Sequence, residues 1–270
     1  MSAMSSAQRK LDRGIQQAHA LYREAKTFED GQAYLLETKR DDRSADEIVY
    51  VCHAIEREAP SSDWPLVLGE VVHNLRGALD HVIYAQTKSR KSGFPVFHDA
   101  CEFQVYGRSK LSGVKESVRA IVEGAQPFNT LPSAPKQAPL YVLHSFWNAD
   151  KHRELKTVAA AVRVPGAAYS APREGAELHI THWASGVRLE NGAHVMTLAV
   201  TGPKADQMEV NPYLIYEVTV EGRSLRNFLS AITKISYGLV HECETGESLP
   251  LMTVDQRLAA RYHGWPHLEE

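Results

Sequence analysis

The chain has 270 residues, of which 43% are hydrophobic and 23% charged, and its formal net charge at pH 7 is −3. These proportions are ordinary for a folded globular protein, and the charge excludes a global basic field that would attract nucleic acid or an acidic membrane. The three cysteines lack CxxC spacing, and no run approaches the roughly 18 apolar residues of a membrane span. We therefore expect a cytoplasmic protein with free thiols and no membrane contact.

The first half of the chain shows helical periodicity interrupted by one pair of strands. Apolar residues recur at helical spacing over 5–27. Two alternating or β-branched runs flank the polar stretch 40–44 and predict a β-hairpin over 31–57. A further helix is predicted over 62–89, with Pro65 in its first turn.

Helix and strand signals alternate in the second half. Helical turns are expected within 101–125, and four prolines predict a largely extended stretch over 126–139. A strong helix follows over 139–156, strand-like segments occupy 157–220, and helical spacing returns over 222–245.

Together these elements predict an α+β protein. Its core would be a helical bundle, with an N-terminal β-hairpin and an antiparallel sheet inserted before the last long helix. We expect a single domain over residues 1–270. Its parts would be a mainly helical, motif-bearing part over 1–156, an antiparallel sheet over 157–220, and a closing helix and tail over 221–270.

The helix predicted over 62–89 has an unusual polar face. An exposed helix face normally carries Lys and Glu, whereas the centre of this helix reads HNLRGALDH. Such a face is either a polar seam against another helix or an active face. Its polar side chains are His73, Asn74, Arg76, Asp80 and His81.

The helix predicted over 139–156 has a similar face. His144, Asn148 and His152 stand at positions i, i+4 and i+8, so they share one side of the helix. We expect the two polar faces to meet in one cleft, within a chain or across a dimer. Further charged residues near its end are Asp150, Lys151 and Arg153.

The strings LGEVVHNLRGALDHVIY, FPVF, QPF and NADKHRELK follow one another within roughly residues 30–160. In this order they resemble a widespread group of uncharacterised bacterial and phage proteins with an HNLRxALDH helix and an N-x-DKHR helix, which implies no function. The segment Arg76 to His81 also resembles the Arg-x4-His pattern of HEPN domains, although Gly77 stands where that pattern often has a polar residue.

HEPN domains are helical bundles, and many are metal-independent ribonucleases of toxin and phage-defence systems that pair their motifs by dimerisation. The resemblance implies that Arg76 would hold the scissile phosphate and that His81 would transfer a proton. It also implies RNA as a substrate and a homodimer, with no cofactor and no metal.

The residue types suit this chemistry. Histidine titrates near neutrality and can act as acid or base, and arginine binds phosphate through a planar fork of donors. The candidates are Arg76, His81 and His152 for catalysis, Asn148, Lys151 and Arg153 for substrate binding, and His73, Asn74, Asp80, His144 and Asp150 for support.

Two further interpretations fit the same residues. In the first, the protein is a non-catalytic binding or structural protein. Arg76 and Asp80 would then form a surface ion pair worth about 0.3–0.5 kcal/mol, and Asn74 and Asn148 would hydrogen bond between helices. In the second, the protein is a metal-dependent hydrolase. Its candidate ligands would be Glu70, His73, Asp80, His144 and His152.

Overall fold

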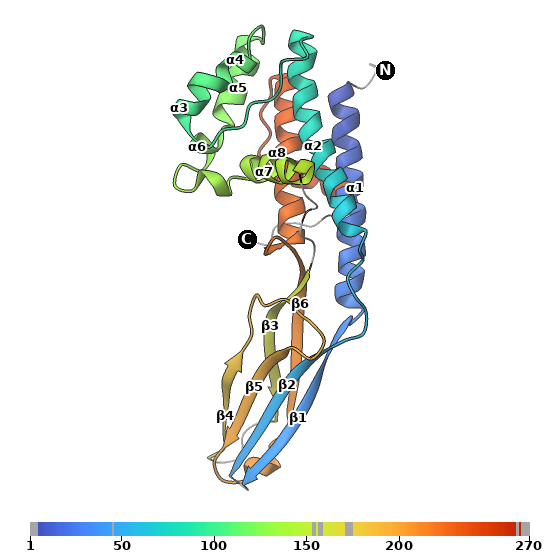
Figure 1. The fold of residues 1–270 in the computed structure, drawn as a ribbon, viewed down its shortest axis with the longest axis vertical. Coiled ribbons are helices and arrows are strands. Elements are labelled where there is room, and N and C mark those ends of the chain that lie inside the picture. The colour runs from blue at the N-terminus through green and yellow to red at the C-terminus, as the bar shows by residue number, and fades with distance from the viewer. Residues whose placement is uncertain are drawn as a thin grey trace. The chain divides into compact units, whose positions relative to one another are not determined.

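The computed structural model describes residues 5–44, 46–152, 155, 159–170, 175–262 and 265. Over this part of the chain the fold is α+β, as predicted, with an N-terminal β-hairpin and later antiparallel strands before the last long helix (Figure 1). The chain forms two compact units. The helical unit comprises residues 1–23, 63–156 and 226–270, and the sheet unit comprises residues 24–62 and 157–225.

Long helices occur where apolar periodicity predicts them. Helix α2 follows Asp63, with Pro65 in its first turn, where the missing N–H of proline costs no hydrogen bond. Its last residue is Thr87, and the next residue, Lys88, caps the helix in the left-handed conformation with φ 55°. The helix bounds are α1 (Ser6–Asp30), α2 (Trp64–Thr87), α7 (Pro139–His152), α8 (Leu225–Thr245) and α9 (Leu251–Arg261).

An apolar stripe along α2 is buried. Its side chains are almost wholly removed from water, which makes α2 a central helix of this unit. Within the described residues, no helix is long and apolar enough to span a membrane. The buried stripe consists of Leu68, Val71, Val72, Leu75, Ala78, Leu79 and Val82.

Glycines allow α2 to approach two neighbouring helices closely. A Cβ at Gly14 of α1 would lie 2.9 Å from Cδ2 and 3.2 Å from the backbone nitrogen of Leu75. A Cβ at Gly69 would collide with the carboxylate of Asp150 of α7. The two glycines therefore set the spacing of α2 from α1 and from α7.

Short helical pieces connect α2 to α7. The prolines of 126–139 do not keep this stretch extended, which corrects the sequence prediction. Proline fits the first turn of a helix, because its fixed φ is helical and that position needs no N–H. The pieces are α3 (Ala100–Glu102), the π-helix η1 (Phe103–Gly107), α4 (Arg108–Lys110), α5 (Glu116–Gly124), α6 (Pro127–Thr130) and the 3₁₀-helix η2 (Pro135–Gln137).

The sheet unit contains two antiparallel sheets in its described residues. The first has the strand order β1-β2-β5-β4, so the predicted hairpin pairs with strands from the second half of the chain, and the second has the order β3-β6-β7. A short 3₁₀-helix, η3 (Ala205–Gln207), precedes β6. The strands are β1 (Tyr34–Ser44), β2 (Glu47–Glu56), β3 (Ala159–Tyr169), β4 (Glu177–Trp183), β5 (His194–Thr201), β6 (Val210–Val220) and β7 (Arg223–Ser224).

The hairpin differs from the prediction in where it turns. The polar stretch 40–44 lies inside β1, and the chain reverses between Ser44 and Glu47. Arg40 pairs with Asp42 on the exposed strand at 2.5 Å. Charged residues that pair with one another can thus continue an edge strand. The polar stretch 40–44 was therefore not the turn that its polarity suggested.

Candidate functional site

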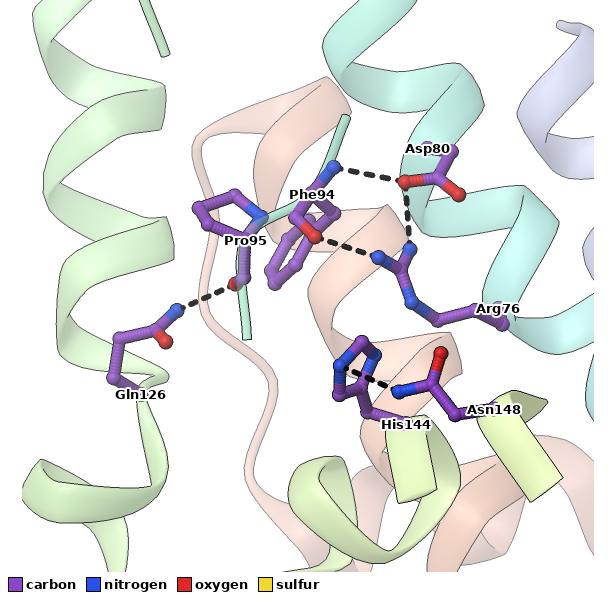
Figure 2. A network of polar contacts seen from close by, with 7 residues as sticks. All are labelled: Arg76, Asp80, Phe94, Pro95, Gln126, His144 and Asn148. Carbon is purple, nitrogen blue, oxygen red and sulfur yellow. Dashed lines mark hydrogen bonds and ion pairs between the residues drawn. The ribbon is translucent and has the colours of Figure 1, made fainter. Parts of the chain in front are cut away.

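Arg76 is buried in the centre of α2 and its guanidinium has two strong partners (Figure 2). Nη1 donates to Oδ1 of Asp80 over 2.7 Å, and Nη2 donates to the carbonyl oxygen of Phe94 over 2.6 Å. Oδ1 of Asp80 also accepts the backbone N–H of Phe94 at 2.9 Å. Only 5% of the Arg76 side chain is exposed. The ion pair predicted for a helix surface is therefore a charge-assisted anchor for the segment 94–97, in which the arginine is buried and Asp80 is partly exposed.

Gln126 holds the same segment from its other side (Figure 2). This fully buried side chain donates from Nε2 to the carbonyl of Pro95 at 2.9 Å and accepts the N–H of Phe97 at 3.0 Å. An extended segment outside a sheet leaves backbone groups without partners. Arg76, Asp80 and Gln126 supply those partners through their side chains.

His144 extends from α7 toward this network (Figure 2). The side-chain amide nitrogen of Asn148 lies 3.1 Å from Nε2 of His144. An amide nitrogen can only donate, so Nε2 accepts and the neutral ring carries its proton on Nδ1. Nδ1 is buried and has no hydrogen-bond partner among the described residues.

His144 is a neutral imidazole at pH 7. Burial, followed by the positive charges of Arg76 and Lys110, lowers its pKa to about 4. Asp80 opposes this shift, and Lys151 adds to it. We call Arg76, Lys110 and Lys151 the cation cluster. It creates a positive potential at a ring that is itself uncharged, which is an environment that favours an anion.

Trp147 brings two of these cations together. Nζ of Lys151 lies 2.9 Å from the centroid of the Trp147 ring, and Cζ of Arg76 lies 4.9 Å from it. The negative face of an aromatic ring attracts cations at such distances. Burial and the charge of Arg76 lower the pKa of Lys151, so Lys151 releases its proton more readily than an ordinary lysine.

The polar face of α2 is divided between two neighbours. Asn74 donates from Nδ2 to Oε1 of Gln17 at 2.8 Å and accepts from Nζ of Lys10 at 3.3 Å, both on α1. Gln17 also donates to Glu70. Of these residues, Arg76 contacts α7 through Trp147, whereas Asn74 and Glu70 contact α1.

The remaining predicted site residues lie apart from the anchor. His73 is exposed on α2, and His152 is exposed at the last residue of α7. His81 is half-buried, and its Nδ1 is buried without a hydrogen-bond partner in the described part of the chain. Asp150 packs against Gly69. Arg153 lies outside the described residues.

The candidate metal ligands are not assembled in the described chain. Among the described residues there is no group of three or more His, Cys, Asp or Glu side chains that could hold a metal ion. Glu70 instead bonds to Gln17, and Asp80 bonds to Arg76.

Three residues of this region were missing from the sequence prediction. Phe94 takes part through its backbone, which its side chain does not reveal. Gln126 precedes a proline in a stretch that seemed merely extended. Trp147 was not selected, because its ring resembles that of an ordinary apolar core residue, although its position four residues before Lys151 is the spacing of a cation–aromatic pair.

Comparisons with protein-family models, with curated proteins and with solved structures find no match to this chain. The geometry of the described residues alone therefore defines the candidate site. It consists of a neutral His144, the cation cluster and Trp147, fastened to the Arg76–Asp80 anchor.

Proposed function

We propose that this protein is a HEPN-like, metal-independent ribonuclease, as in toxin and phage-defence systems, and that His144 is the general base of the cleavage. The observation that carries the proposal is that the ring of His144 lies 5.8 Å from the ring of Trp147, over which Arg76 and Lys151 both lie. A neutral imidazole is in the form that a general base needs, and the negative charge of a bound phosphate would raise its pKa from about 4 toward the working pH. Cations beside it can stabilise a phosphate that gains charge.

The reaction assigns one role to each group. His144 accepts the proton of the ribose 2′-hydroxyl through Nε2, after Asn148 turns aside. The 2′ oxygen attacks phosphorus, and the bond to the 5′ oxygen breaks. Lys151 gives its proton to that leaving oxygen, because its lowered pKa makes it a better acid. The products are a 2′,3′-cyclic phosphate and a 5′-hydroxyl.

This assignment changes the role of Arg76 from the one that the resemblance implies. Both terminal nitrogens of Arg76 already bond to Asp80 and Phe94, so Arg76 positions the site and contributes charge, while Lys110 and Lys151 meet the phosphate. His81 and His152 remain candidates for proton transfer in a homodimer. There, a histidine of one copy would act together with a histidine of the second copy.

A second candidate function is a non-catalytic binding or structural protein. The burial of Arg76 favours it, because an arginine with two short hydrogen bonds can serve entirely to fix the segment 94–97. Under this alternative the cation cluster would stabilise the crossing of α2 and α7 through Trp147 and would have no substrate.

One experiment separates the two. The full chain is incubated with end-labelled single-stranded RNA in EDTA, beside the variants His144→Gln and Lys151→Ala. The expected result is cleavage by the wild type with a 2′,3′-cyclic end, and a loss of roughly 10²–10⁴-fold in either variant. Lys115→Ala serves as the charge control, since Lys115 is exposed at the start of α5.

Three outcomes would contradict the ribonuclease proposal. The first is no cleavage by a folded wild type, the second is cleavage that disappears on chelation, and the third is equal activity in His144→Gln. Circular dichroism of each variant shows whether a loss of activity reflects a loss of fold.

A further inference from the structure

Three histidines from three neighbouring strands gather on one face of the four-stranded sheet. His53 of β2 lies opposite His194 of β5 in the strand register, with ring centroids 5.5 Å apart. His182 of β4 stacks on His194, with centroids 4.2 Å apart and ring planes 13° apart. We call these three residues the histidine cluster.

The geometry of the cluster disfavours protonation. Two imidazolium rings stacked at this distance would place like charges almost in contact. Nε2 of His194 is hydrogen bonded to Oγ1 of Thr197 at 2.7 Å. Burial, followed by the charges of His182 and His53, lowers the pKa of His194, and a hydrogen bond to the backbone of Met196 opposes the shift.

Charged groups on the adjoining strands already have partners. On β1, Glu37 lies opposite His53 and pairs with Lys39 at 3.9 Å. On β4, Glu177 pairs with His179 at 3.3 Å. Both carboxylates therefore already have partners on their own strands.

Strand β4 depends on this contact more than the other strands do. In the sheet order it bonds to β5 alone, and nearly all of it is exposed. Ile180 and Trp183 are 47% and 54% exposed, so they add little burial to hold it. Edge strands of this kind open at a low cost in free energy.

We propose that the histidine cluster is a pH-sensitive contact that holds β4 on β5 at neutral pH and releases it in mildly acidic solution. With β4 in place, the folded state prefers neutral His194. Release of β4 removes the stacked ring of His182 and returns the pKa of His194 toward its ordinary value of about 6.5. The contact is therefore fully formed above that pH and weakens as the pH falls. Each pKa unit of lowering multiplies the ratio of open to closed strand about tenfold at low pH.

Amide hydrogen exchange of the full chain tests this proposal. Protection of β4, corrected for the intrinsic effect of pH on exchange, is compared at about pH 7.5 and about pH 5, on either side of the ordinary histidine pKa. We expect protection of β4 to fall at the lower pH, while the pairing of β1 with β2 changes less. His182→Gln should remove most of this dependence, and His179→Gln, on the same strand but paired with Glu177, should preserve it.

Equal protection of β4 at both pH values would overturn the proposal, as would a pH dependence that persists in His182→Gln. Should that variant fail to fold, imidazole NMR of the wild type still decides. His194 is expected to titrate below about 6.5, the ordinary histidine pKa, and titration at or above that value would overturn the proposal.

Discussion

Asp80 and the buried Arg76 form an ion pair whose carboxylate oxygen also accepts the backbone N–H of Phe94. This pair joins a helix to an extended segment fourteen positions further along the chain. Because both terminal nitrogens of Arg76 bond to groups of the protein itself, Arg76 fixes the segment 94–97 against α2.

Removing Arg76 should destabilise the protein strongly. Arg76→Ala would remove the arginine partner of the Asp80 carboxylate and of the Phe94 carbonyl, at a cost of about 2–4 kcal/mol in the free energy of unfolding. The double variant Arg76→Met/Asp80→Leu should cost less than the sum of the two single changes, because the residues are coupled. Urea denaturation measures each value, and a loss below about 1 kcal/mol for Arg76→Ala would mean that the pair behaves as a surface ion pair.

Gln126 should matter in a comparable way although it is uncharged. Gln126→Leu would remove the partners of the carbonyl of Pro95 and the N–H of Phe97, which should lower the free energy of unfolding by about 2–4 kcal/mol. Gln137→Leu is the control, because Gln137 is exposed in η2. Equal urea midpoints for the two variants would refute the anchoring role of Gln126.

Two helical glycines should respond to alanine with opposite signs. At Gly14 a new Cβ would press on the side chain and backbone of Leu75. Gly14→Ala would push α1 away from α2 and should lower the free energy of unfolding by about 1–3 kcal/mol. At Gly238 of α8 nothing lies within 4 Å of the new Cβ, so Gly238→Ala should stabilise the protein by up to about 1 kcal/mol through helix propensity. Thermal unfolding compares the two, and stabilisation by Gly14→Ala would show that the helices are not in close contact there.

The low pKa of His144 should appear as a pH dependence of stability. Folded His144 takes up a proton only near pH 4, whereas the unfolded chain takes it up near about 6.5. The stability that this residue contributes is therefore present above pH 6.5 and is lost as the pH falls toward 4. The loss should be on the order of 2 kcal/mol, and His144→Gln should not show that part of it. Parallel pH curves for the wild type and His144→Gln would contradict this assignment.

The sequence predicted the long helices and the hairpin because their signals are local. The apolar stripe of α2 is buried residue for residue, and Pro65 marks its first turn. Strand order was not predictable in the same way. The pairing of β2 with β5 joins residues far apart in the chain, and the sequence of neither strand indicates which strand it pairs with.

The candidate site was predicted only in part, because side-chain chemistry is visible in the sequence and the packing of the helices is not. Arg76, Asp80, His144 and Lys151 could be selected because their side chains carry the chemistry. Which neighbour each polar residue of α2 contacts depends on how the other helices pack around it. The sequence therefore did not show that Asn74 bonds to α1 while Arg76 does not. Phe94 was invisible because its backbone, and not its side chain, makes the contact.

The most direct test of the central claim is the pKa of His144, followed by NMR of its imidazole in the full chain with and without a single-stranded RNA oligonucleotide. We predict a pKa of about 4 in the free protein and a clear rise when the phosphates bind beside it, because a nearby negative charge favours the imidazolium. Lys151→Ala should weaken that rise. A His144 that titrates near its ordinary value of about 6.5 in the free protein, or whose pKa does not change in the presence of RNA, would contradict the account.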